Sequence, residues 1–425
     1  MDAAFSTDED FAHHLDSEDP LRHLRNRFHI PVGADGEPVI YFVGNSLGLM
    51  PKATRGLVEQ ELDDWAGLAV DAHLEGNTPW YSYHETVREP VARLVGAKPG
   101  EVVCMNSLTV NLHLMMATFY RPTKSRFKIL MEEPAFPSDT YAVKSQIAHH
   151  GFDPNEGLLL ARPREGEFTV RQEDIEATLE KHGEQVTLVL FAGVNFFTGQ
   201  LFDIQNITAA AQKAGCLVGI DLAHAAGNVP LALHDWNVDF AVWCSYKYLN
   251  SGPGAVAGAF VHERHATNRE LPRLAGWWGN DPATRFQMHL LPEFVPVSSA
   301  DAWAVSNPPI LSLAPLRASL AIFDEAGGME ALRAKSMKLT GYFRFLFDRA
   351  PSGLFTVITP SEPNEWGCQL SILAHEHPKE LFAKLEAAGI KCDFREPNVI
   401  RAAPTPLYNT FHEVWRVAKL LSEHH

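Results

Sequence analysis

The chain has 425 residues, 46% of them hydrophobic and 21% charged, which is the profile of a soluble globular protein with two or more domains. Its formal net charge of −16 argues against nucleic acid or an anionic membrane as the main binding partner. No run approaches the roughly 20 apolar residues of a membrane helix, and the acidic start lacks the order of a signal peptide.

The use of cysteine and histidine indicates an intracellular protein without a metal. The five cysteines are scattered and odd in number, with no CxxC pair, so we expect reduced thiols and a cytoplasmic location. The 20 histidines show no HExxH or similar spacing, and we therefore expect no structural or catalytic metal.

The first 310 residues predict an N-terminal segment followed by a large α/β domain. Residues 1–50 are at first polar and helix-prone, and they end in a short extended piece and a Gly/Asn/Ser turn. Beyond residue 100, apolar strands such as "RFKILME" and "QVTLVLFAGV" alternate with helices such as "FPSDTYAVKSQIAHH". This alternation predicts a mostly parallel sheet covered by helices on both faces, over residues 51–310.

The C-terminal part predicts a second, smaller domain. Residues 311–335 belong to a long helical stretch that we expect to connect the two domains. Residues 336–425 contain two strands, a helix, two more strands and a last helix, which is typical of an α+β domain. The segment 1–50 is expected to pack with this small domain.

Two charged residues stand at the ends of predicted strands. Asp221 directly follows "CLVGI", and Lys247 follows "DFAVWCS". Ligands bind at the carboxyl ends of strands in open α/β sheets. Taken singly, Asp221 is as well explained by a helix N-cap and Lys247 by a side chain reaching solvent. As a pair they meet the two demands of pyridoxal 5'-phosphate (PLP): a lysine for its aldehyde and an acid for its ring nitrogen.

Other residues near predicted strand ends fit the rest of such a cofactor. Leu108 and Thr109 begin a predicted helix, where free N–H groups favour a phosphate. Phe136 is placed to stack on a ring, although an aromatic residue there is in isolation better explained by the core. Tyr246 stands next to the lysine, and His224 lies three residues after Asp221, where a structural hydrogen bond is the simpler role.

Several long motifs together resemble the kynureninase family, PLP-dependent enzymes with the aspartate-aminotransferase-like fold. They are "YFVGNSLGL", "LTVNLHLMM", "FPSD", "DLAHAAGNV", "WCSYKYLNSGPG", "GWWG", "SNPPI" and "APTPLYNTFHEVW". The resemblance covers nearly the whole chain. It implies hydrolysis of the Cβ–Cγ bond of L-kynurenine or 3-hydroxy-L-kynurenine to an anthranilate and L-alanine, in tryptophan catabolism and NAD biosynthesis.

The resemblance also implies a role for individual residues. Lys247 would form the Schiff base with the cofactor, and Asp221 would pair with its ring nitrogen. The positions that match cofactor contacts are Leu108, Thr109, Phe136, Pro137, Ser138, Asp139, Asp221, His224, Tyr246, Lys247, Trp277 and Asn307. Those that match substrate contacts are Ser46, His73, Asn307 and Arg401, of which the arginine would pair with the α-carboxylate.

Three further expectations follow from the resemblance. The site would lie at a homodimer interface, with Trp277 and Asn307 supplied by the second subunit. Lys247 would take the Cα proton, and Tyr246 would donate or accept a proton in later steps. A hydrogen bond from His73 or Asn307 to a phenolic hydroxyl would favour 3-hydroxykynurenine.

One position departs from the family, and three alternative functions are left open. Ala192 stands where relatives commonly carry serine or threonine, so the expected hydroxyl contact to the cofactor is missing. A cysteine desulfurase or an aminotransferase would share the fold, although the cysteines lie in or beside apolar strands instead of a polar loop. A non-catalytic binding module is opposed by the presence of Lys247, Asp221 and Arg401 together.

Overall fold

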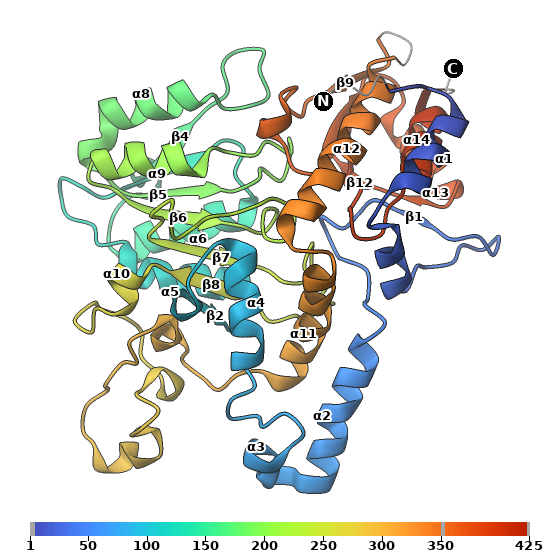
Figure 1. Ribbon diagram of the computed structural model, residues 1–425. Helices are drawn as coiled ribbons and strands as arrows, with labels where there is room; N and C mark the ends of the chain where they lie inside the picture. Colours follow the sequence, from blue (N-terminus) through green and yellow to red (C-terminus); the bar gives the residue numbers. More distant parts are fainter. Residues whose placement is uncertain (1–4, 350–352, 423–425) are drawn as a thin grey trace.

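The computed structural model describes residues 5–349 and 353–422. Its central feature is a seven-stranded sheet in the order β2-β8-β7-β6-β5-β3-β4 (Figure 1). The strands are β2 (Val102–Cys104), β3 (Lys128–Glu132), β4 (Leu158–Ala161), β5 (Val186–Ala192), β6 (Leu217–Asp221), β7 (Phe240–Trp243) and β8 (Gly258–Val261). The neighbours from β7 across to β4 are parallel, and β8 runs antiparallel to both β7 and β2. The predicted mostly parallel sheet is confirmed.

Helices cover both faces of this sheet, because successive side chains along a strand point to opposite faces. Along β5, Leu188 and Leu190 pack toward one face, whereas Val189 and Phe191 pack toward the other. The first face is covered by α5 (Leu108–Phe119) and α6 (Pro137–His149), and the second by α4 (Glu85–Val95), α8 (Gln172–His182), α9 (Ile204–Lys213) and α11 (Ile310–Glu325).

A second, smaller sheet lies in the C-terminal part of the chain. Its order is β12-β13-β10-β9, and all of its strand pairs are antiparallel. The strands are β9 (Phe355–Val357), β10 (Leu370–Ala374), β12 (Asp393–Arg395) and β13 (Val399–Ala402). Around them pack α12 (Met329–Phe347), α13 (Pro378–Ala387) and α14 (Phe411–Ser422), which share a separate hydrophobic core with the sheet. The predicted small α+β domain is confirmed.

The N-terminal residues contribute to the second core. Helix α1 (Glu9–Glu18) buries Ala12 and Leu15 there. Strand β1 (Ile40–Tyr41) pairs in parallel with β11 (Ile390–Lys391). The blue N-terminal helix and the red C-terminal helix accordingly lie side by side in Figure 1.

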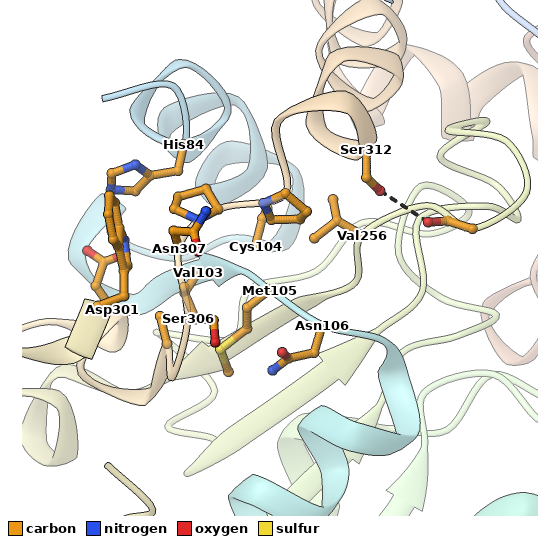
Figure 2. A pocket seen from close by; sticks show the side chains of 15 residues that line it. His84, Val103, Cys104, Met105, Asn106, Val256, Asp301, Ser306, Asn307 and Ser312 are labelled. Carbon is orange, nitrogen blue, oxygen red and sulfur yellow. Dashed lines mark hydrogen bonds between the residues drawn. The ribbon is translucent and has the colours of Figure 1, made fainter. Parts of the chain in front are cut away.

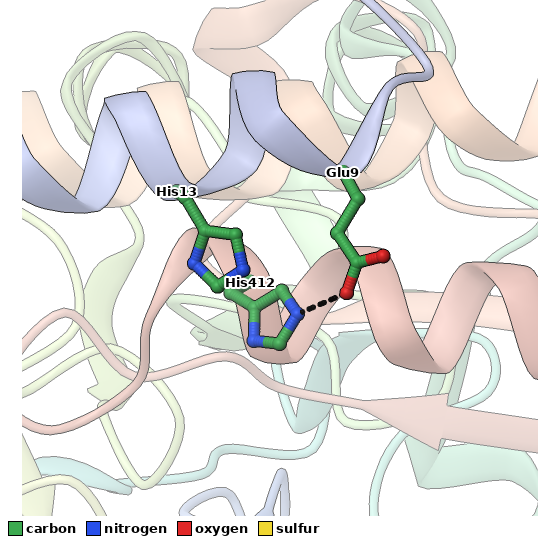
Figure 3. A group of neighbouring side chains, drawn as sticks. All are labelled: Glu9, His13 and His412. Atoms are coloured by element: carbon green, nitrogen blue, oxygen red, sulfur yellow. Dashed lines mark hydrogen bonds and ion pairs between the residues drawn. The ribbon is translucent and has the colours of Figure 1, made fainter.

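Polar contacts join α1 to α14. Asp16 accepts hydrogen bonds from the backbone N–H groups of Phe411 and His412 at 2.6 and 3.0 Å. The His412 Nε2 atom lies 2.9 Å from a Glu9 carboxylate oxygen, and its ring stacks on that of His13 with 4.0 Å between the centroids (Figure 3). An acidic side chain of α1 therefore satisfies free donors at the start of α14.

Two helices lead from the large core to the small one. Helix α11 packs on α2 (Thr54–Leu68) and α4, whereas α12 packs on α14. Between them Gly327 and Gly328 adopt φ angles of 84° and 86°, a conformation that glycine accepts without strain. The predicted connector over residues 311–335 spans this break. The remaining short α-helices are α3 (Ala72–Glu75), α7 (Pro154–Gly157) and α10 (Glu263–Ala266).

Across residues 5–349 and 353–422, none of the helices is both long enough and apolar enough to span a membrane.

Candidate active site

Lys247 and Asp221 lie at the same edge of the large sheet. Lys247 follows β7 and Asp221 ends β6, and these strands are parallel neighbours. Their positions at adjacent carboxyl ends agree with the prediction. The Lys247 Nζ atom lies 3.1 Å from His224 Nε2 and 5.8 Å from the centre of the Phe136 ring. The structure thus brings together the lysine, the histidine and the aromatic ring that the sequence predicts for one site.

The turn that carries Ser46 packs against the lysine segment. The Gly48 N–H donates a hydrogen bond to the Tyr246 carbonyl oxygen at 2.8 Å. A Cβ atom on Gly48 would lie 2.3 Å from the Lys247 carbonyl oxygen and 2.3 Å from Asn250 Oδ1, far inside normal contact distances. Only glycine allows this close approach between the turn, which includes the exposed Ser46, and the backbone of Tyr246 and Lys247.

His224 is buried next to the lysine and has an unused ring nitrogen. Its Nδ1 atom has no hydrogen-bond partner among the described residues. Burial first, and then the positive charges of Lys247, Arg401 and Arg395, hold the pKa of His224 well below its ordinary value. The imidazole is therefore neutral near pH 7, and its Nε2 atom can accept an N–H from the lysine.

Asp221 and Asp139 form a buried pair of carboxyl groups. They are 6% and 5% exposed, and an Asp221 oxygen accepts the Ala223 N–H at 2.7 Å. Burial, and then the negative charge of the neighbouring Asp221, raise the pKa of Asp139 well above its usual range. The Asp139 Oδ1 atom has no partner among the described residues. A buried acid pair with an unused acceptor fits a protonated ring nitrogen such as that of PLP.

The N-termini of α5 and α6 lie next to each other. The Thr109 hydroxyl of α5 lies 3.2 Å from the Ser138 hydroxyl of α6. Leu108 and Pro137 are the first residues of the two helices, and the residues that precede them make no side-chain cap. Free N–H groups and two hydroxyls thus face the same region, an arrangement that fits a phosphate group.

Tyr246 keeps its proton at neutral pH. The side chain is half-buried, and burial together with the neighbouring Cys244 thiol raises the pKa of the phenol far above its ordinary value. The hydroxyl is therefore able to donate a hydrogen bond or a proton, but it is not a base in the free enzyme.

Arg401 is a buried cation that reaches from the small domain to the large one. The side chain is 1% exposed, and it donates to the Phe196 carbonyl oxygen at 2.6 Å. On the neighbouring strand β12, Asp393 forms an ion pair with it. The Phe196 ring contacts the Phe136 ring at 5.3 Å, so the guanidinium lies close to the predicted site. Its Nε atom has no partner among the described residues and is free for a carboxylate.

The other predicted residues gather in a different place. His73, Trp277 and Asn307 line a cavity of about 520 Å³. Asn307 also borders a smaller cavity of about 240 Å³, which reaches Asn106 just before α5 (Figure 2). Lys247 lines neither cavity. Within one chain, these three predicted residues are therefore grouped with one another and not with the lysine.

Sequence reasoning missed two acidic residues of this region. Glu132 at the end of β3 is a buried carboxyl group close to Asp221 and Asp139. Its place at the end of an apolar strand, "KILME", was the available signal. Asp393 is the ion-pair partner of Arg401, and only the register between β12 and β13 identifies it.

Two groups of histidine and glutamate have side-chain ligand atoms within 4.8 Å of one another in the described part of the chain. They are Glu9, His13 and His412, and Glu101, His234 and His262. The first joins α1 to α14, as described above. In the second, Glu101 accepts the backbone N–H groups of Lys98 and Glu263. Neither group includes a residue predicted for the site, and packing and capping account for their contacts.

Comparison with solved structures shows the fold. A variant of the cystine C–S lyase C-DES with glycine covalently linked to its PLP cofactor superimposes with a TM-score of 0.75 at 17% identity, over 90% of this chain and 96% of that one. A cysteine desulfurase from Escherichia coli gives a TM-score of 0.75 at 16% identity, over 94% and 97% of the two chains. These likenesses identify the fold of PLP-dependent enzymes.

Comparison of sequences shows the family. Residues 332–421 match the model of the kynureninase C-terminal domain, and residues 45–235 match that of aminotransferase class I and II. Kynureninase from Myxococcus xanthus is 57% identical over 99% of this chain and 98% of that protein. Kynureninase from Koribacter versatilis is 54% identical over 97% of each. Identity at this level over nearly the full length, on a fold whose strand ends carry a fitting lysine and acid pair, shows that the chain belongs to the kynureninase family of PLP-dependent enzymes.

Proposed function

We propose that this protein hydrolyses the Cβ–Cγ bond of L-kynurenine to give anthranilate and L-alanine. The convergence of Lys247, Asp221 and Arg401 at the carboxyl end of the large sheet is the observation that carries the proposal. It combines a primary amine, an acid for a ring nitrogen and a guanidinium for a carboxylate. The full-length identity to kynureninases selects this reaction among those of the fold.

The cofactor would be held by residues at the ends of β6 and β7 and at the starts of α5 and α6. Lys247 would bond its aldehyde carbon, and Asp221 with Asp139 would pair with its ring nitrogen. Thr109 and Ser138 would hydrogen-bond the phosphate at the two helix N-termini, with the ring stacked on Phe136. When bound, PLP supplies an electron sink for the charge that develops on the substrate carbons.

The protein's own groups would bind the substrate and move its protons. Arg401 would fix the α-carboxylate through its free Nε atom and so orient the Cα–H bond toward Lys247. The Lys247 amine, once released from the cofactor, would take the Cα proton, with neutral His224 3.1 Å away. Tyr246 would serve as the proton donor of the later steps, because its phenol is protonated in the free enzyme.

The working form would be a homodimer in which each site is completed by the partner chain. His73, Trp277 and Asn307 are grouped apart from Lys247 within one chain. Several large apolar side chains are exposed around this region, including Val70, Leu74, Trp277, Phe286 and Leu311. Burial of such side chains by a second copy would be favourable and would bring the two groups of residues together.

Two finer features of the function are also proposed. Hydrogen bonding of a phenolic hydroxyl by His73 or Asn307 would make 3-hydroxykynurenine the preferred substrate, which a comparison of kcat/KM for the two substrates tests. A cytoplasmic location is supported by the five scattered cysteines without a CxxC pair. A role in tryptophan catabolism and NAD biosynthesis is supported by the identity to kynureninases.

The fluorescence of anthranilate tests the central proposal. The enzyme supplied with PLP should become fluorescent on addition of L-kynurenine, whereas the Lys247→Ala variant should not. Sulfide release from L-cysteine without anthranilate formation would instead identify a desulfurase. All five cysteines are buried, so none is placed as the mobile nucleophile that a desulfurase needs.

A further inference from the structure

Glu132 is a third buried carboxyl group beside the acid pair of the site. It ends β3 and is 2% exposed. Both of its oxygens lie 3.3 Å from the backbone nitrogen of Ala192, which ends β5. The influences on this carboxyl group among the described residues include the negative charge of Asp221 but no cation. A carboxylate buried in this way without a counter-ion is strongly disfavoured.

The three carboxyl groups come from three different elements and influence one another. Glu132 lies on β3, Asp139 in the first turn of α6, and Asp221 at the end of β6. The negative charges of Asp221 and Glu132 raise the pKa of Asp139, and the positive charge of Lys247 lowers it. Because one lysine cannot neutralise three charges in a buried site, part of the cluster must remain protonated.

The backbone around Glu132 connects it with the partner of the cofactor's ring nitrogen. Ala192 lies directly opposite Asp221 in the parallel register of β5 and β6. The next residue, Gly193, donates its N–H to the Asp221 carbonyl oxygen at 2.7 Å. By accepting the Ala192 N–H, the Glu132 side chain holds the strand end against which Asp221 is aligned.

We propose that Glu132 is a neutral carboxylic acid in the protein before PLP binds and acts as a positioning residue for Asp221. Burial and the negative charge of Asp221 raise the pKa of Glu132 to about 8, which agrees with this assignment. In this form Glu132 binds the Ala192 N–H without adding a second negative charge beside Asp221. The role rests on the proposed function only in that Asp221 is taken to pair with the ring nitrogen.

This role predicts how each form of the side chain affects cofactor binding. Glu132→Gln keeps the shape and an oxygen acceptor for Ala192, so it should retain the affinity for PLP within about threefold at pH 7. Glu132→Ala removes the acceptor and should weaken PLP binding about tenfold or more. As pH rises through about 8, Glu132 ionises and places a negative charge beside Asp221 in the wild type alone. The PLP affinity of the wild type should therefore depend more strongly on pH in this range than that of Glu132→Gln.

Infrared spectroscopy of the apo protein tests the protonation state directly. The C=O stretch of a protonated carboxylic acid should appear in the difference between wild type and Glu132→Gln at pH 7, and it should lose its intensity as pH rises through about 8. Glu133→Gln is the matched control, since Glu133 is the next residue and forms an exposed ion pair with Arg162. That variant should leave both the band and the PLP affinity unchanged.

The outcome that would overturn the proposal is equally specific. If no protonated-acid band separates wild type from Glu132→Gln, and this variant binds PLP more than about tenfold more weakly at pH 7, Glu132 works as an anion. Neither measurement uses kynurenine, so the result stands whether or not the protein hydrolyses it.

Discussion

Lys247 Nζ and His224 Nε2 lie 3.1 Å apart in a region where two arginines add further positive charge. The histidine is the neutral member of this contact, because burial and its cationic neighbours hold its pKa well below the ordinary value. This arrangement gives the lysine a polar partner without adding a charge that would repel its ammonium form.

The neutral state of His224 predicts how the stability of the apo protein depends on pH. Since the folded pKa is lower than the unfolded one, the unfolded chain binds more protons on acidification. The contribution of neutral His224 to the free energy of unfolding is therefore fully present above about pH 6.5. It is lost as pH falls below this value, at up to about 1.4 kcal/mol per pH unit.

Thermal unfolding of apo variants checks this dependence. Between about pH 6.5 and 5, the free energy of unfolding of the His224→Gln variant should fall less than that of the wild type. His289→Gln, which alters an exposed histidine, should follow the wild-type curve. Parallel curves for wild type and His224→Gln would contradict a neutral buried histidine.

Gly48 predicts a sharp contrast between two glycine substitutions. A Cβ atom there would meet the Lys247 carbonyl oxygen and Asn250 Oδ1 at 2.3 Å, so Gly48→Ala must move the lysine segment. We expect a loss of stability of about 1–3 kcal/mol and weaker PLP binding. Gly56→Ala in the exposed part of α2 meets nothing within 4 Å and should stabilise the protein by up to about 1 kcal/mol. Denaturant unfolding and PLP titration of both variants check the contrast, which equal effects would refute.

The sequence alone was sufficient to predict the neighbourhood of Asp221 and Lys247. Both follow apolar strands, and the carboxyl ends of parallel strands meet at one edge of a sheet. The two strands are adjacent, so both residues lie at the same edge of the sheet. Here the local pattern and the tertiary structure depend on the same physical rule, namely the packing of apolar parallel strands between helices.

Other contacts depend on tertiary structure that a single sequence does not reveal. Glu132 lies near Asp221 because only one strand, β5, stands between β3 and β6 in the sheet, although the three strands are far apart in the chain. Asp393 pairs with Arg401 because of the register between two short antiparallel strands. Strand order and register are set by the packing of the whole domain, so the contacts of these two residues became visible only in the structure.

Arg401 predicts a selective loss of substrate binding. Lysine cannot replace the planar guanidinium, which pairs with Asp393 and still offers a free Nε–H group to a carboxylate. Arg401→Lys should raise KM for kynurenine by about thirtyfold or more. The variant should also distinguish less well between kynurenine and the corresponding amine that lacks the α-carboxylate. Steady-state kinetics with both compounds checks this, and Arg55→Lys on the exposed face of α2 is the control. Unchanged KM in Arg401→Lys would assign the carboxylate to another residue.

The separation of Asn307 from Lys247 predicts complementation between two inactive variants. If Asn307 of one chain completes the site built on Lys247 of the other, a mixed dimer of Lys247→Ala and Asn307→Ala contains one intact site. Random exchange of subunits should then restore up to about a quarter of wild-type activity.

Mixing Lys247→Ala with His224→Ala is the matched control, because these residues contact each other within one chain and no intact site can form. Recovery in the first mixture alone, measured by anthranilate fluorescence after denaturation and joint refolding, is the expected result. Equal absence of recovery in both would place Asn307 in the site of its own chain or outside it.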